Sequence, residues 1–67
     1  MARHRIVRRM GTQEPGLEKP WTCRALVVMG SRKAWVIASG ETHTEASERL
    51  ALLIEKQVAD WETRTDG

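Results

Sequence analysis

The hydrophobic positions of the chain form two short runs followed by one longer periodic segment. Residues 21–29 and 34–39 are mostly strand formers, and the polar segment Gly30-Ser31-Arg32-Lys33 separates them. Two runs of this kind, joined by a short polar loop that contains glycine, are typical of an antiparallel hairpin. We therefore expect two paired strands in the middle of the chain.

After the hairpin, the polar and apolar residues follow the period of an α-helix. Thr42 and Glu45 have the spacing of a capping box, so a helix is predicted to begin at residue 43. Residues in a helix follow one another at about 100°, which places these apolar side chains in one stripe: Ala46, Leu50, Leu53, Ile54, Val58 and Trp61. Glu45 and Arg49 are spaced for an ion pair on the polar face. The pattern predicts an amphipathic helix that reaches Trp61 and buries the stripe.

Residues 1–20 precede the hairpin and differ from it in composition. A short alternation at residues 5–8 is compatible with an edge strand or with a disordered basic arm, and the pattern leaves both open. Residues 11–20 hold both prolines and two of the five glycines, which is typical of a loop. We therefore divide the chain into a basic arm and loop (1–20), a domain (21–62) in which ordered structure begins, and a flexible tail (63–67) without an apolar anchor.

These elements predict a small α+β fold, with an antiparallel sheet of two or three strands and one long C-terminal helix on one face. Alternate side chains of a strand point to opposite faces, and both faces of both strands are largely apolar. Because one helix covers only one face, we expect Leu26, Val28 and Val36 to remain uncovered by it. An apolar face of this kind usually marks an interface. Its cover is expected to be the N-terminal segment, a second copy of the chain or a partner, and Leu52, alone on the polar face of the helix, is a further contact candidate.

The length of the chain strengthens the case for self-association. A domain of about 60 residues buries only about 60% of the surface that its unfolded chain exposes, and this chain has 67 residues. Its single cysteine, Cys23, can form no internal disulfide. Oligomerisation is a common remedy for such small folds, so we expect a homodimer.

The net charge of +2 hides a division of the chain into a basic and an acidic half. Residues 1–33 hold eight Lys or Arg and two acids, whereas residues 34–67 hold three bases and seven acids. Lys and Arg release counterions from phosphates when they bind nucleic acid. The basic arm and the hairpin loop therefore supply the candidate nucleic-acid contacts Arg3, Arg5, Arg8, Arg9, Arg32 and Lys33. The three tryptophans, which could stack on unpaired bases, fall at positions typical of a core.

The sequence contains no recognisable catalytic, cofactor or metal motif. Cys23, His4 and His43 are scattered without the spacing of a zinc site, and a strand position favours an inert buried thiol for Cys23. Acidic residues at the helix start are typical of a solvated first turn. We therefore expect no enzyme, no catalytic residues, no cofactor, no metal and no small-molecule substrate.

The apolar segments are too short for a membrane protein. The longest runs have five residues, whereas a membrane-spanning helix needs about 20. The basic N-terminus also lacks the apolar stretch of a secretory signal. We therefore expect no membrane contact and a cytoplasmic location.

Part of the chain resembles known families. Residues 35–46, WVIASGETHTEA, are similar to the strand, G-x-T cap and helix start of HicB-type antitoxin domains. The hairpin followed by a helix also resembles the arm-type DNA-binding domain of tyrosine recombinases, in which a three-stranded sheet enters the major groove and a helix packs behind it. This second resemblance implies phosphate or base contacts for Arg24, Arg32 and Lys33. Double-stranded RNA-binding domains share the order of elements, but this helix start lacks their lysines.

The sequence thus predicts a small non-enzymatic interaction or regulatory protein of the kind found in phages, mobile elements and antitoxin loci. It would act by binding a macromolecular partner, as a homodimer. The alternative is a sequence-tolerant DNA-binding module that uses the basic arm and the hairpin loop.

Overall fold

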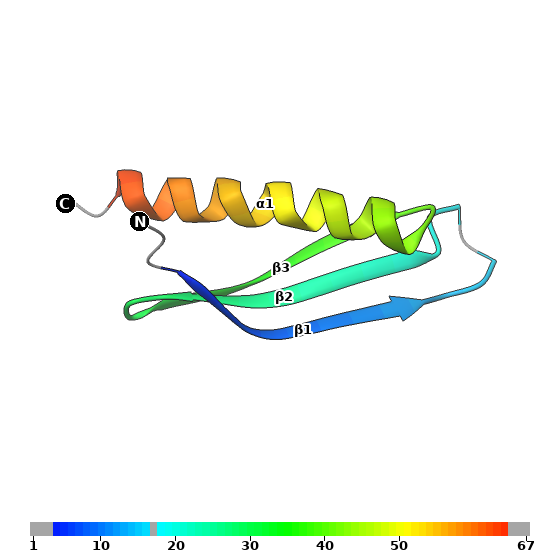
Figure 1. Ribbon diagram of the computed structural model, residues 1–67, viewed down its shortest axis with the longest axis horizontal. Helices are drawn as coiled ribbons and strands as arrows, with labels where there is room; N and C mark the ends of the chain where they lie inside the picture. Colours follow the sequence, from blue (N-terminus) through cyan, green and yellow to red (C-terminus); the bar gives the residue numbers. More distant parts are fainter. Residues whose placement is uncertain (1–3, 17, 65–67) are drawn as a thin grey trace.

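The computed structural model describes residues 4–16 and 18–64, which form three strands and one helix (Figure 1). The strands are β1 (Arg5–Gln13), β2 (Trp21–Met29) and β3 (Arg32–Gly40), and the helix is α1 (His43–Thr63). The strands form one antiparallel sheet in the order β1-β2-β3, and α1 lies along one face of it. The predicted α+β fold is confirmed.

The core lies between α1 and the two strands β2 and β3. Its buried side chains come from these three elements: Cys23, Ala25, Val27, Met29, Val36, Ala38, Ala46, Leu50, Ile54 and Val58. Trp21 and Trp61 are half-buried against its two ends. The helix packs chiefly on β3 and then on β2, and all nine residues of β1 are exposed. The sheet is therefore wider than the helix that covers it.

The buried face of α1 differs from the predicted stripe at Leu53. This side chain is 38% exposed, whereas Leu50 and Ile54 are buried. Because α1 lies over β2 and β3, the centre of its contact surface passes through Leu50 and Ile54. Leu53 is left on the flank of the helix, in a shallow groove beside Trp35 and Ile37. Burial of Leu53 was thus a wrong prediction.

The N-terminal segment is an edge strand rather than a disordered arm. β1 pairs with β2 from the Arg5–Val28 pair to the Gln13–Trp21 pair, with one irregularity around Val7. Ordered structure therefore begins at Arg5 or before it, whereas the sequence predicts that it begins at Trp21. Backbone hydrogen bonds stabilise a strand even when its side chains are exposed, and hydrophobic periodicity does not detect this contribution.

The connection between β2 and β3 is shorter than predicted. Only Gly30 and Ser31 separate the two strands, and Met29 pairs directly with Arg32. Gly30 has a φ of 64°, a conformation that most residues adopt only at a cost. At the C-terminus, Thr63 still belongs to α1 and Arg64 caps it, while the rest of the predicted tail, 65–67, lies outside the described residues.

The predicted capping box is present in part at the start of α1, because the Glu45 side chain reaches back to the N–H of Glu41 rather than to that of Thr42. The backbone N–H of Glu45 donates to Thr42 Oγ1 at 3.1 Å, and the Glu45 carboxylate accepts a hydrogen bond from the backbone N–H of Glu41 at 3.3 Å. Glu45 also forms the predicted ion pair with Arg49, at 3.2 Å. These contacts fix where the helix begins relative to the end of β3.

A glycine allows the end of β3 to approach the first turn of α1. A methyl group added to Gly40 would lie 2.7 Å from the backbone nitrogen of Ala46, which is too close for any side chain. We therefore expect Gly40→Ala to lower the free energy of unfolding by about 1 to 3 kcal/mol, as overpacking of a rigid site does. Urea denaturation would measure the loss. The control is Gly11→Ala, whose new methyl group would meet only ordinary contacts of 3.5 Å and longer and should change stability much less.

Candidate nucleic-acid interface

The register of the strands determines which side chains share the sheet face that α1 leaves uncovered. Directly opposed residues of antiparallel strands lie on the same face. Leu26 lies between Arg8 and Trp35, and Arg24 lies between Met10 and Ile37. We call this surface the open face; its residues are Arg5, Arg8, Met10 and Thr12 on β1, Thr22, Arg24, Leu26 and Val28 on β2, and Lys33, Trp35, Ile37 and Ser39 on β3.

The open face is basic, and the helix on the other side of the sheet is acidic. Four of the twelve residues that the register places on the open face are Arg or Lys, and none is Asp or Glu. By contrast, α1 carries five acids and two bases. The bases that face away from α1 thus lie on the opposite side of the sheet from the acids of α1.

The apolar part of the open face differs from the predicted one in β3. Val36 is only 9% exposed and pairs with Ala25 on the face under α1, so it was wrongly predicted to be uncovered. Its neighbours Trp35 and Ile37 lie on the open face instead and are 47% and 54% exposed. Leu26 and Val28 do lie on that face, where both are half-buried.

The even number of residues in the turn was the signal that sequence reasoning missed. If Gly30 and Ser31 alone form the turn, Leu26 must lie opposite Trp35, and the two side chains share a face. A loop of residues 30–33 would shift the pairing by two residues and would still place Trp35 on the face of Leu26 and Val28, because two residues are one full period of a strand. Trp35 is consequently an exposed surface aromatic residue rather than the core residue that the sequence suggested.

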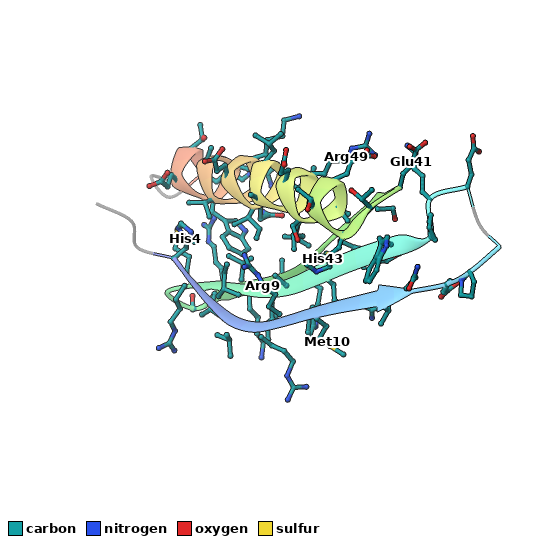
Figure 2. All side chains as sticks on the ribbon, turned by 45° about the vertical axis from the view of Figure 1, so that its right-hand side comes forward. His4, Arg9, Met10, Glu41, His43 and Arg49 are labelled. Atoms are coloured by element: carbon teal, nitrogen blue, oxygen red, sulfur yellow. The ribbon has the colours of Figure 1, made fainter. Side chains whose placement is uncertain are left out.

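The structure brings together only some of the predicted nucleic-acid contacts. Arg5, Arg8, Arg24 and Lys33 share the open face. Arg9 pairs with Ala25 and lies on the α1 side of β1, whereas Met10 points away from α1 (Figure 2).

Arg32 also does not belong to the open face. Its guanidinium donates a hydrogen bond to the carbonyl oxygen of Trp61, 3.2 Å away at the end of α1. That Arg32 contacts phosphate stays a prediction, and the structure gives its guanidinium a partner within the chain. Arg3 lies outside the described residues.

Leu52 lies far from the other predicted interface residues. It is 62% exposed on α1, and it shares a shallow apolar hollow on the helix with Leu53 and Ala59. Leu26 and Val28 are on the opposite side of the sheet. A single flat partner surface therefore cannot contact Leu52 and the open face together.

The only cysteine is packed into the core beside the start of α1. Cys23 is 3% exposed, and its Sγ lies 3.8 Å from Ser47 Oγ. The exposed His43 ring packs edge-on against Trp21, with the ring centres 5.2 Å apart. The contacts of Cys23 and His43 are thus those of side chains that pack between β2 and the start of α1.

Two further observations concern ligands and membranes. Within residues 4–16 and 18–64, no three His, Cys, Asp or Glu side chains are grouped so that they could hold a metal ion. Over the same residues, no helix combines the length and the apolar character needed to cross a membrane.

Comparison of the chain with protein-family models, with curated proteins and with solved structures gave no match. The resemblances to HicB-type antitoxin domains and to arm-type DNA-binding domains therefore stay hypotheses.

Proposed function

We propose that this protein is a small non-enzymatic binding module whose macromolecular partner is DNA, held on the open face with little preference for sequence. The observation that carries the proposal is the charge of this face: four bases, no acid among its twelve described residues, and an acidic helix behind it. DNA carries one negative charge per about 1.7 Å of its axis. The acidic surface of α1 would repel DNA, so the open face is the side of the molecule that can bind it.

The spacing of the bases supports contact with several phosphates. Neighbouring strands lie about 4.8 Å apart and alternate residues of a strand about 7 Å apart. The four bases of the open face, which occupy all three strands, therefore spread over roughly 10 by 14 Å. Over such a distance a duplex presents many phosphate charges. Each base can reach its own phosphate.

The composition of the open face supports binding with little sequence preference. Asn and Gln typically recognise adenine, Asp and Glu recognise cytosine, and Arg and Lys bind guanine as well as phosphate. Of these six residue types, the twelve residues of the open face include only Arg and Lys. The exposed Trp35 offers a flat ring for a base or a sugar, a contact that tolerates any base. Phosphate and ring contacts together favour affinity over base discrimination.

Two adjacent arginines of β1 provide a matched test. Arg8 lies on the open face and Arg9 on the opposite one, so Arg8→Gln and Arg9→Gln remove the same charge from different sides. Binding to a labelled duplex should lose affinity in Arg8→Gln, and the slope of log affinity against log salt should fall in size by about 1 per protomer. Arg9→Gln should keep the wild-type slope.

Other outcomes of this titration would contradict the proposal. Equal losses in the two variants would indicate non-specific attraction to a basic molecule rather than a defined face. Absence of duplex binding at low salt would exclude DNA and favour a protein partner for the open face.

A further inference from the structure

The two edges of the sheet differ in how well they suit pairing with another strand. β1 has an irregularity around Val7 and carries three arginines, and bulges and charges are features that protect an edge from further pairing. β3 pairs regularly with β2 over all nine residues. Its only bases, Arg32 and Lys33, stand at its start. The edge of β3 is therefore the less protected of the two.

The backbone groups at the edge of β3 are correctly placed for another strand. The Arg49 guanidinium donates to the carbonyl oxygen of Ser39 at 3.0 Å, so this carbonyl points away from β2. Backbone groups alternate in direction along a strand, and those of Ile37, Trp35 and Lys33 consequently point to the same free edge. The Ser39 carbonyl retains a second acceptor position.

We infer that β3 pairs with β3 of a second copy of this chain and forms a symmetric antiparallel homodimer. Val36 is the central residue of the strand Arg32–Gly40. A two-fold axis through it would pair all nine residues. Trp35 would then lie opposite the partner's Ile37, which is a favourable aromatic and β-branched pair.

The charges of β3 also fit this register. Lys33 would lie opposite the partner's Ser39 and Arg32 opposite the partner's Gly40, so no two like charges face each other across the strands. A pairing centred on Ala34, two residues nearer the start of β3, would place Lys33 opposite the partner's Trp35. Ile37 would then have no aromatic residue opposite it. The register centred on Val36 therefore uses the whole strand and its best side-chain pair.

The helices fit the same two-fold axis. Gly40 touches the start of α1 at Ala46, and Arg32 bonds to its end at Trp61, so the middle of β3 lies level with Leu53. Leu53 lines the groove above the edge of β3, beside Val36 and Ile37. In the dimer this groove would be closed, because Leu53 would meet the partner's Leu53.

The spacing between the two helices is also suitable. Strands lie about 4.8 Å apart, so the proposed axis lies half that spacing outside β3. A helix over the line midway between β2 and β3 is then roughly 5 Å from the axis. The two helices would then be about 10 Å apart, which is at the upper end of the 8–10 Å spacing of packed helices. The partner copy thus accounts for the exposed flank of α1 and for the unpaired strand edge at once.

The dimer is independent of DNA binding and compatible with it. Pairing at the edge of β3 extends the sheet in its own plane to six strands. It leaves both open faces uncovered and on the same side. The basic surface would therefore double in size.

Sedimentation equilibrium of the full chain without DNA tests the inference. The wild-type protein should show twice the monomer mass of 7.6 kDa. Leu53→Glu should be monomeric at the same concentration, because two carboxylates would meet at the axis. The matched control is Leu52→Glu, one residue away on the outer side of α1, which should remain dimeric.

A second variant tests the strand contact separately. Ile37→Pro removes a backbone N–H that points to the free edge, and proline is tolerated at edge positions of this kind. It should be monomeric and retain the wild-type circular dichroism spectrum. A monomeric wild-type protein, or a dimer that dissociates in Leu52→Glu and persists in Leu53→Glu, would overturn the inference.

Discussion

Replacing Leu50 with alanine is expected to lower the free energy of unfolding by about 2 to 5 kcal/mol. Leu50 is 2% exposed and is one of the two largest fully buried side chains of the described residues. Its truncation would leave a cavity between α1 and the two strands beneath it, and a small domain has little other core to compensate. Urea denaturation followed by circular dichroism would measure the loss.

The neighbouring leucines provide the control for this experiment. Leu52 and Leu53 are 62% and 38% exposed, so Leu52→Ala should change the stability of the monomer by less than about 0.5 kcal/mol and Leu53→Ala by clearly less than Leu50→Ala. In a monomeric background such as Ile37→Pro, equal losses at Leu50 and Leu53 would mean that α1 is rotated about its axis so that Leu53 faces the sheet.

Neutralising the open face is expected to have the largest effect on DNA binding. The variant carries four Gln substitutions, at Arg5, Arg8, Arg24 and Lys33. If each base meets one phosphate, log affinity should fall with log salt at a slope of about −0.9 per contact. With four contacts, raising the salt from about 50 to 200 mM should lower the affinity of the wild-type protein roughly 100-fold. The variant should lose at least that factor at low salt, as measured by fluorescence anisotropy with a labelled duplex.

The control for the neutralised face uses bases elsewhere on the molecule. Arg9→Gln combined with Lys56→Gln removes two charges, one from the α1 side of β1 and one from α1 itself. This variant should bind the duplex nearly as well as the wild-type protein. A comparable loss would contradict the assignment of binding to the open face.

The parts of the fold that were predicted from the sequence are those with a strong local pattern. β2 was predicted with its observed bounds, Trp21–Met29, because proline and glycine enclose a run of strand formers. The start of α1 followed from the Thr42 and Glu45 capping box. The pattern leaves β1 undecided, because its side chains are all exposed and its stability comes from pairing with a distant segment.

The candidate site was predicted less completely than the fold. The sequence identified the basic residues, but the direction of each depends on strand register. The turn at Gly30 and Ser31 sets the register for Lys33, whereas Arg5 and Arg8 share a face only because the pairing of β1 shifts between Ile6 and Arg8. Arg9 was included although it lies on the opposite side from Arg8, and Trp35 was assigned to the core although it is exposed. Such properties belong to the pairing of strands rather than to any single segment.

The salt dependence of duplex binding by the wild-type protein tests the central claim most directly. We predict a straight line of log affinity against log salt with a slope near −3.6 per protomer, which corresponds to four phosphates met by the four bases of each open face. A slope near zero, or no binding to the duplex at low salt, would contradict the claim that this face binds DNA.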